Sequence, residues 1–266
     1  GNVCNRGSFI AATYESRNPF KFFAFDGVLG LALPSMSQGP DFNLMSRMKD
    51  GRVLRSALFS VFLSDMDTER SEVTFGEVKS DHLASDLFWV PVQRDSGYWE
   101  VMIEDITLNN QKQQICAGCF VAVDTGTSEL AGPSDVIEIL TQKVGVQSNC
   151  GNYDDLPKLG FVVGDHILNL EPKVYIDRDS NGCDVAFMPL DVPPPQGPLF
   201  VFGIPFLQKF FTVYDEANRR IGFGVANHTN QDPATASTLL VSLKGTVNSH
   251  LGHLEPQQTG NLRVSK

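Results

Sequence analysis

Short apolar runs separated by small polar clusters recur along most of this chain. The runs end in Gly, Pro, Asn, Asp or Ser, a pattern typical of β-strands joined by turns. The clearest strands are expected at residues 74–76, 99–108 and 159–163. The pattern therefore predicts an all-β protein.

Two stretches instead have the three- and four-residue apolar spacing of helices. Residues 41–50 have this spacing, and we expect Asp41 to cap that helix. Residues 134–144 follow a proline and place Leu140 and Val144 on one face. Helices are therefore few and short in the predicted fold.

One apolar run ends abruptly in a small polar loop. Residues 120–123 read Phe-Val-Ala-Val and are followed by Asp124, Thr125 and Gly126. This pattern predicts a buried strand that ends in a tight turn. A carboxylate held there lies beside an apolar core, where its surroundings can shift its pKa. Asp-Thr-Gly also occurs in ordinary turns, so the tripeptide alone does not identify a site.

The wider sequence gives this loop a context. Residues 120–130, Phe-Val-Ala-Val-Asp-Thr-Gly-Thr-Ser-Glu-Leu, resemble the second active-site loop of the pepsin-like aspartic proteases, the pepsin, cathepsin D and plasmepsin type. Further segments resemble that family in the same order, namely residues 25–32, 58–63, 89–92, 97–99, 201–203 and 210–215. The resemblance extends from about residue 1 to residue 227, and the chain is identified as a member of the family.

The resemblance implies a fold and a domain organisation. The fold is all-β and bilobal, the pepsin-like acid protease fold, here with a partial N-lobe, a complete C-lobe and a few short helices. Residues 1–95 are expected to form the second half of the N-terminal lobe, and residues 96–227 the C-terminal lobe with the catalytic loop. A helix is implied near residues 206–210. The polar tail at residues 228–266 shows no resemblance, and we expect it to be mostly disordered.

The resemblance also implies roles for individual residues. Asp124 would be one of two catalytic aspartates, and Thr125 would clamp the active-site loops together. Gly126 would let the substrate backbone approach closely, and Thr127 and Ser128 would contact the carboxylate or the substrate. The other substrate-binding residues implied by position are Val28, Phe25, Met188, Leu190 and Val201. Such side chains suit bulky apolar substrates, and each could equally be ordinary core.

The chain has one Asp-Thr-Gly loop but two of the segments that the family pairs with such loops. These are Val28-Leu29-Gly30 and Val201-Phe202-Gly203. Because the segment at residues 28–30 has no Asp-Thr-Gly loop to pair with, we expect the second catalytic Asp and the mobile flap to lie in a missing upstream segment. The implied function is an aspartic endopeptidase that acts on protein or peptide substrates, needs no cofactor, binds pepstatin-type inhibitors and is monomeric when complete. This fragment alone is expected to be inactive.

Two other functions are considered. A homodimer could supply Asp124 twice, but a one-lobe enzyme has no use for the segment at residues 28–30. A non-catalytic pseudoprotease or binding protein on the same fold would carry a degenerate upstream motif. The intact loop at residues 124–128 favours catalysis.

The five cysteines indicate an oxidising compartment. Cys116 and Cys119 form a Cys-x-x-Cys pair, which is compatible with a disulfide, a redox site or zinc. A zinc site would want a second close pair, so we expect no metal. The resemblance implies the disulfides Cys116–Cys119 and Cys150–Cys183. Cys4 is left over, either because its partner is missing or as a buried free thiol.

Charge and hydropathy exclude two classes of partner. The net charge of −10 argues against nucleic-acid binding, which needs a basic face. No apolar run has the length of a membrane span. Asn227 opens a glycosylation sequon. With the disulfides and the resemblance, the sequon favours the secretory pathway, a lysosome-like or vacuolar compartment, or secretion.

Overall fold

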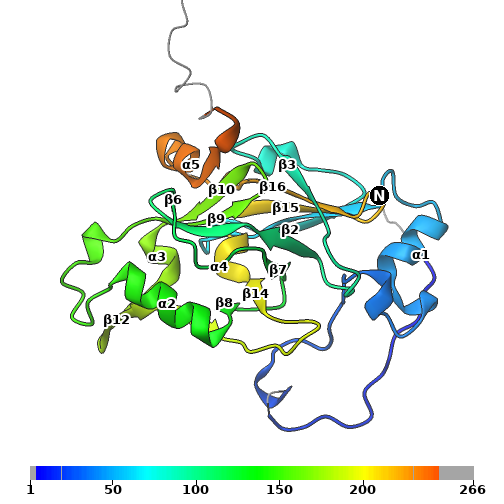
Figure 1. Ribbon diagram of the computed structural model, residues 1–266. Coiled ribbons are helices and arrows are strands. Elements are labelled where there is room, and N and C mark those ends of the chain that lie inside the picture. The colour runs from blue at the N-terminus through cyan, green and yellow to red at the C-terminus, as the bar shows by residue number, and fades with distance from the viewer. Residues whose placement is uncertain (1–3, 19, 230, 246–266) are drawn as a thin grey trace, which may run out of the picture.

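The computed structural model describes residues 4–18, 20–229 and 231–245. Within these residues the chain forms three five-stranded sheets, one hairpin and a few short helices (Figure 1). The mostly-β fold predicted from the sequence is therefore confirmed. No helix in this part of the chain is long and apolar enough to cross a lipid bilayer.

The sheet that carries the Asp-Thr-Gly loop has the strand order β13-β8-β14-β7-β4. Its strands are β13 (Phe187–Pro189), β8 (Leu130–Gly132), β14 (Leu199–Phe202), β7 (Cys119–Val123) and β4 (Glu100–Ile103). β7 runs parallel to β14 and antiparallel to β4. Because β7 lies between these two strands, the continuous apolar run at residues 120–123 is that of an interior strand.

A second sheet has the order β2-β1-β15-β16-β3. Its strands are β2 (Glu72–Phe75), β1 (Leu58–Phe62), β15 (Phe210–Asp215), β16 (Arg220–Val225) and β3 (Phe88–Pro91). Strands from before residue 95 and after residue 210 thus share one sheet. The division into lobes at residues 1–95 and 96–227 stays a prediction.

Aromatic side chains connect these two sheets. The rings of Phe59 on β1 and Tyr214 on β15 are stacked, with centroids 4.5 Å apart. Trp99, just before β4, packs edge-on against both rings, at 6.0 and 5.3 Å. All three residues are almost fully buried. Pairs of this kind stabilise beyond their buried area, and here they fix the loop-bearing sheet against its neighbour.

The third sheet has the order β17-β10-β9-β5-β6. Its strands are β17 (Leu240–Ser242), β10 (His166–Leu170), β9 (Leu159–Val163), β5 (Asp105–Leu108) and β6 (Gln111–Lys112). A separate hairpin pairs β11 (Ile176–Asp179) with β12 (Gly182–Val185). β9 lies where the sequence predicted a strand, and the predicted strand at residues 99–108 is divided into β4 and β5.

The expectation of a mostly disordered tail from residue 228 is wrong for residues 231–245. This segment forms α5 (Pro233–Leu239) and then β17, which pairs with β10. Asp232 caps the helix by accepting from Ala234 N and Thr235 N, and Leu239 is buried. A few apolar residues are enough to order this polar segment, because the edge of β10 is available to pair with it. Residues 246–266 lie outside the described part.

The helices partly match the predictions. α2 (Ser134–Val144) has the predicted bounds and ends at Gly145, which adopts the left-handed conformation that glycine favours. α1 (Leu44–Asp50) begins later than expected, because Asn43 rather than Asp41 accepts from Ser46 N. α4 (Ile204–Leu207) lies earlier than the expected 206–210. The remaining α-helix is α3 (Pro172–Tyr175).

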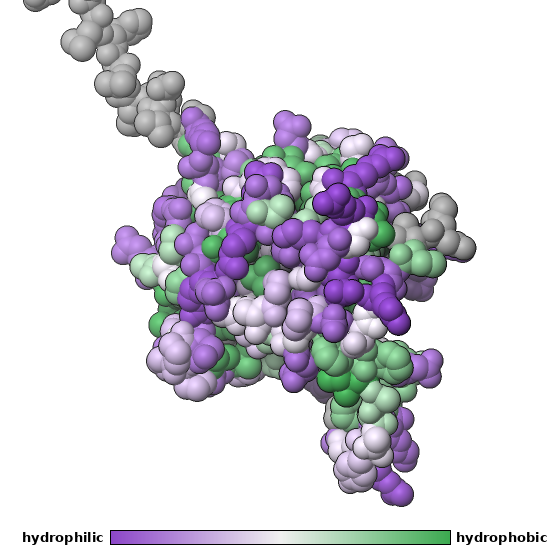
Figure 2. Space-filling model, turned by 90° about the vertical axis from the view of Figure 1, so that its right-hand side faces the viewer, coloured by the Kyte–Doolittle hydropathy of each residue, from purple (hydrophilic) through white to green (hydrophobic). Residues whose placement is uncertain are grey.

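The N-terminal segment carries an unusual number of exposed apolar side chains. They are Phe9, Ile10, Tyr14, Phe20, Phe22, Phe23, Phe25, Val28 and Leu29. The segment loops away from the sheets in Figure 1, and Figure 2 shows a partly hydrophobic projection at the same end of the molecule. Exposed apolar surface of this extent usually marks a place where another polypeptide segment packs.

Candidate active site

The Asp-Thr-Gly loop begins where β7 ends. Val123 is the last residue of β7 and pairs with Phe202 of β14. The next amide, Asp124 N, donates to Phe202 O at 3.1 Å. The backbone of Asp124 is therefore still tied to the sheet, whereas its side chain is free to project beyond the strand end.

Hydrogen bonds from the loop orient the carboxylate of Asp124. Gly126 N donates to Oδ1 at 2.9 Å, and the hydroxyl of Thr127 donates to Oδ2 at 2.6 Å. A Cβ on Gly126 would lie 3.2 Å from Oδ1, so a side chain there would crowd the carboxylate. The side chain of Asp124 remains partly exposed. Each oxygen thus accepts one bond and keeps a lone pair for another partner.

The other side of the loop rests on the start of α4. Thr127 O accepts from Ile204 N at 2.9 Å. A Cβ on Gly203 would lie 2.1 Å from Glu129 O and 2.4 Å from Thr127 O. This close backbone contact explains why a glycine is needed after Phe202, and it couples the loop to β14.

Asp124 opens into a pocket of about 230 Å³. The pocket is mostly apolar, and its lining residues are Val28, Leu29, Gly30, Leu31, Ala32, Met36, Phe59, Tyr98, Trp99, Ala122, Val123, Asp124, Thr125, Gly126 and Tyr214. One carboxylate in a mostly apolar hollow is suited to acid–base chemistry on a polar group of a ligand whose apolar side chains fill the hollow.

Several pocket residues were not named as site residues from the sequence. Trp99 donates from its indole to Leu31 O at 2.9 Å, and its own carbonyl accepts from Val123 N at 2.9 Å. Tyr214 is fully buried, which raises the pKa of its hydroxyl, and the charge of Asp124 raises it further. The only sequence signal for Trp99 was its place in the Gly-Tyr-Trp segment. Phe59 and Tyr214 lie in the family-like segments 58–63 and 210–215, but their place in the pocket could not be predicted, because they reach it from a neighbouring sheet.

The predicted site residues do not all reach the pocket. Those that line it are Val28, Asp124, Thr125 and Gly126. Those outside it are Phe25, Thr127, Ser128, Met188, Leu190 and Val201, of which Thr127 still contacts the carboxylate. Val201 is buried between β7 and β8, whereas Met188 is exposed on β13. Their substrate-binding roles stay predictions.

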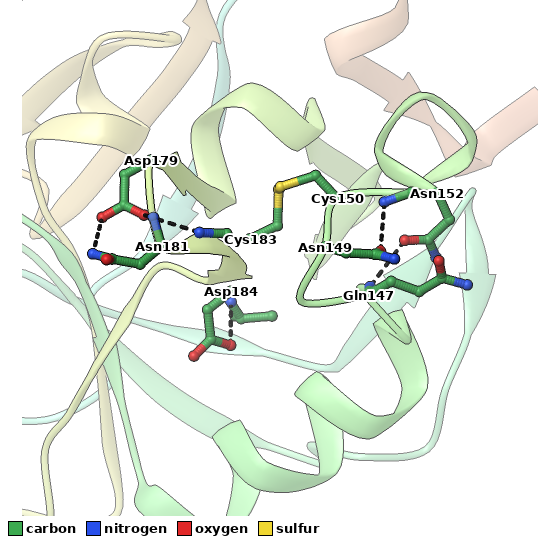
Figure 3. Close-up of a disulfide and its surroundings, with 11 residues drawn as sticks. Gln147, Asn149, Cys150, Asn152, Asp179, Asn181, Cys183 and Asp184 are labelled. Atoms are coloured by element: carbon green, nitrogen blue, oxygen red, sulfur yellow. Dashed lines mark hydrogen bonds between the residues drawn. A yellow bond between two sulfur atoms is a disulfide. The ribbon is translucent and has the colours of Figure 1, made fainter.

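Both predicted disulfides are present. Cys116–Cys119 joins the turn before β7 to the first residue of that strand. Cys150–Cys183 joins the loop after α2 to β12, as Figure 3 shows. Around the second bridge, Asp179 accepts from Asn181 N and Gly182 N, and Asn152 accepts from Gln147 N. Cys4 is exposed and unpaired, rather than the buried thiol that was one of its two expected states.

The predicted glycosylation residue lies on the surface. Asn227 is exposed and lies two residues after the end of β16, and its side-chain amide donates to Asp81 O at 2.9 Å. Its modification stays a prediction.

Known proteins resemble this chain over most of its length. The family model described as "Eukaryotic aspartyl protease" matches residues 2–226. Pepsin A of Sus scrofa and of Canis lupus familiaris are each 32% identical over 231 residues, and pepsin A of Bos taurus is 31% identical over the same number. These matches cover 84% of this chain and 60–62% of each relative. The chain therefore belongs to the eukaryotic aspartyl protease family.

Proposed function

We propose that this chain is part of an aspartic endopeptidase and that Asp124 is one of its two catalytic carboxylates. The observation that carries the proposal is the geometry of Asp124. Its carboxylate leaves the end of an interior strand, is oriented by Gly126 and Thr127, and faces a largely apolar pocket. Membership of the protease family supports the same reaction class.

The proposed chemistry needs two carboxylates that share one proton. Like charges a few ångströms apart do not both ionise easily, so one group acts as a base toward water while the other acts as an acid toward the leaving amine. Assistance of this kind contributes roughly 10²–10⁴ in rate. Gly126 N and the Thr127 hydroxyl leave one lone pair free on each oxygen of Asp124. One oxygen can therefore contact the water while the other faces the second carboxylate.

We infer that the second carboxylate comes from a segment outside these 266 residues. The chain spans about 60% of the length of the pepsin A relatives. Gly203 is packed against the Asp-Thr-Gly loop, whereas a Cβ on its counterpart Gly30 would meet nothing within 4 Å. The exposed side chains of Val28 and Leu29 lie beside Gly30. Sequencing the native transcript upstream of the codon for Gly1 would find an in-frame Asp-Thr-Gly; its absence would favour the pseudoprotease.

The proposed substrates are proteins or peptides with bulky apolar residues near the cleaved bond, because the pocket beside Asp124 is mostly apolar. Pepstatin-type inhibitors would bind in the same place. We propose that the complete protein is monomeric and acts in a lysosome-like or vacuolar compartment or after secretion. The two disulfides fit the secretory route.

The test is acid-pH cleavage of an unfolded protein by the complete gene product. Asp124→Asn should lower the rate by at least roughly 10²-fold, since an amide neither takes nor gives the proton. Asp154→Asn, which removes an exposed carboxylate outside the pocket, is the matched control and should not change the rate. The 266-residue chain alone should not cleave. Undiminished cleavage by Asp124→Asn would contradict the proposal.

A further inference from the structure

His228 is a buried histidine that does not line the pocket at Asp124. It follows β16, and only 6% of its surface is exposed. Both ring nitrogens lie close to oxygen atoms. Nδ1 is 2.7 Å from Glu69 Oε2, and Nε2 is 2.5 Å from the carbonyl oxygen of Gln208.

The surroundings of the ring determine where its protons are. The Gln208 carbonyl can only accept, so Nε2 must donate to it. Glu69 accepts from Thr229 N at 2.8 Å and from the Thr229 hydroxyl at 3.1 Å, both at Oε1. These bonds favour the ionised carboxylate, which makes Nδ1 the donor to Oε2. A neutral imidazole has only one N–H, and in this place it would direct a lone pair at an oxygen.

The charges around the ring balance only if it is protonated. Asp65 Oδ1 lies 3.4 Å from Nδ1, and its other oxygen is bound by Lys209 Nζ at 2.5 Å. Two carboxylates thus face Lys209 and His228. Burial by itself would raise the pKa of Glu69, but hydrogen bonds from His228 and Thr229 outweigh it and lower that pKa.

The remaining charged groups nearby do not change this balance. Lys173, Glu171 and Asp232 line the same hollow. Lys173 is paired with Glu171 at 2.9 Å, and Asp232 caps α5. The ring of His82 is stacked on that of Phe62, with centroids 4.1 Å apart, and its Nε2 lies 3.1 Å from Glu72 Oε2.

The contacts of His228 join two parts of the chain that are 159 residues apart in sequence. One is the connection at residues 63–71 between β1 and β2, which carries Asp65 and Glu69. The other is the segment at residues 226–245, which continues into α5 and β17. The edge strand β17 makes three register pairs with β10. The segment is also held by the buried side chains of Ala236 and Leu239 and by Leu243 N, which donates to Asp165 O, so release of the ring should loosen it without unfolding it.

We propose that His228 is a pH-sensitive clasp. In acid its doubly protonated ring holds residues 63–71 against residues 226–245, and loss of one ring proton loosens both segments. Histidine is the side chain whose charge ordinarily changes between about pH 5 and 8. The proposal does not depend on the proposed function, because it concerns only these contacts.

A metal ion is the competing interpretation of the same cluster. Ligand atoms of Asp65, Glu69 and His228 all lie within 4.8 Å of one another. However, a metal would have to displace Lys209 from Asp65 and take the place of the ring proton. Protection of the two segments by added Zn²⁺ at neutral pH, with no response to pH in chelator, would overturn the clasp.

The test is hydrogen exchange of the full chain at pH 5 and pH 7.5, with protection factors corrected for intrinsic exchange. Protection of residues 63–71 and 226–243 should fall by about tenfold or more at the higher pH, which corresponds to about one pKa unit of differential interaction. Protection of β9, in the third sheet, should not change. His228→Gln should have low protection in both segments at both pH values.

Two further variants make the test specific. Glu69→Gln keeps a hydrogen-bond acceptor but removes the negative charge, so protection in this variant should change less with pH than in the wild type. This variant tests the clasp even if His228→Gln does not fold. His166→Gln, which removes a histidine whose Nδ1 has no partner in the described residues, should keep the wild-type response. A wild type insensitive to pH, a Glu69→Gln variant with the full pH response, or NMR that finds only one N–H on the His228 ring at pH 5 would overturn the proposal.

Discussion

Gly203 separates the Asp-Thr-Gly loop from the start of α4 and leaves no room for a side chain. In Gly203→Ala the new Cβ would lie 2.1 Å from Glu129 O and 2.4 Å from Thr127 O. A carbon–oxygen contact needs about 3.3 Å, so the loop has to retreat by roughly 1 Å. Overpacking typically costs 1–3 kcal/mol, and because both contacts are with backbone we expect about 3 kcal/mol.

The same shift should affect catalysis more strongly than stability. The Thr127 hydroxyl orients the carboxylate of Asp124, and it moves with the loop. A displacement of about 1 Å at a reacting group can cost about 10²-fold in rate. Urea unfolding of the complete gene product would measure the loss of stability, and acid-pH turnover at saturating substrate would measure kcat.

Gly30→Ala is the matched control, because a Cβ at Gly30 meets nothing within 4 Å in the described residues. In the 266-residue chain this change should alter the urea midpoint little. In the complete protein it should be as harmful as Gly203→Ala, if a second Asp-Thr-Gly loop packs there. A Gly203→Ala variant with both the wild-type urea midpoint and the wild-type kcat would show that the loop does not need this close contact.

Arg94→Met should cost about 3–5 kcal/mol in urea unfolding, because it leaves the fully buried carboxylate of Glu100 without the guanidinium that lies 2.6 Å from it. Adding Glu100→Gln to Arg94→Met should recover part of this loss. Equal stability of the single and double variants would contradict the prediction. Replacing Cys150 and Cys183 by Ser should lower the free energy of unfolding by about 4 kcal/mol, against about 2 kcal/mol for the Cys116–Cys119 pair. The reason is that a disulfide across a longer loop constrains the unfolded chain more. Equal losses of melting temperature would argue against this entropic explanation. Burial alone would raise the pKa of Asp215, but hydrogen bonds from Asn218 and Arg220 lower it, so its stabilisation is present above about pH 4 and is lost as the pH falls through its folded value. Asp215→Asn should therefore flatten the stability profile between pH 5 and pH 2, as followed by urea unfolding, and an unchanged slope would contradict the assignment.

Local pattern was sufficient for some elements of this fold. The run at residues 120–123 identified β7 and its terminal turn, and helical spacing after a proline identified α2 with its observed bounds. Capping was harder to predict, because Asp41 and Asn43 are both good caps and only the tertiary path of the chain selects Asn43.

Long-range pairing accounts for what the sequence did not reveal. β17 is stable because β10 offers it an edge, and no local signal in a polar tail predicts that edge. Tyr214 and Phe59 reach the pocket from a different sheet, so their role depends on how two sheets pack. The clasp at His228 likewise depends on Glu69, which is distant in sequence.

The central claim is that Asp124 belongs to a proton-sharing pair of carboxylates. Its most direct test is the pH profile of kcat/KM for the complete gene product and its Asp124→Asn variant, with one peptide substrate. We predict an acid bell-shaped profile for the wild type, set by the pair as a unit, and no measurable bell for the variant. An Asp124→Asn enzyme with the wild-type profile would contradict the account.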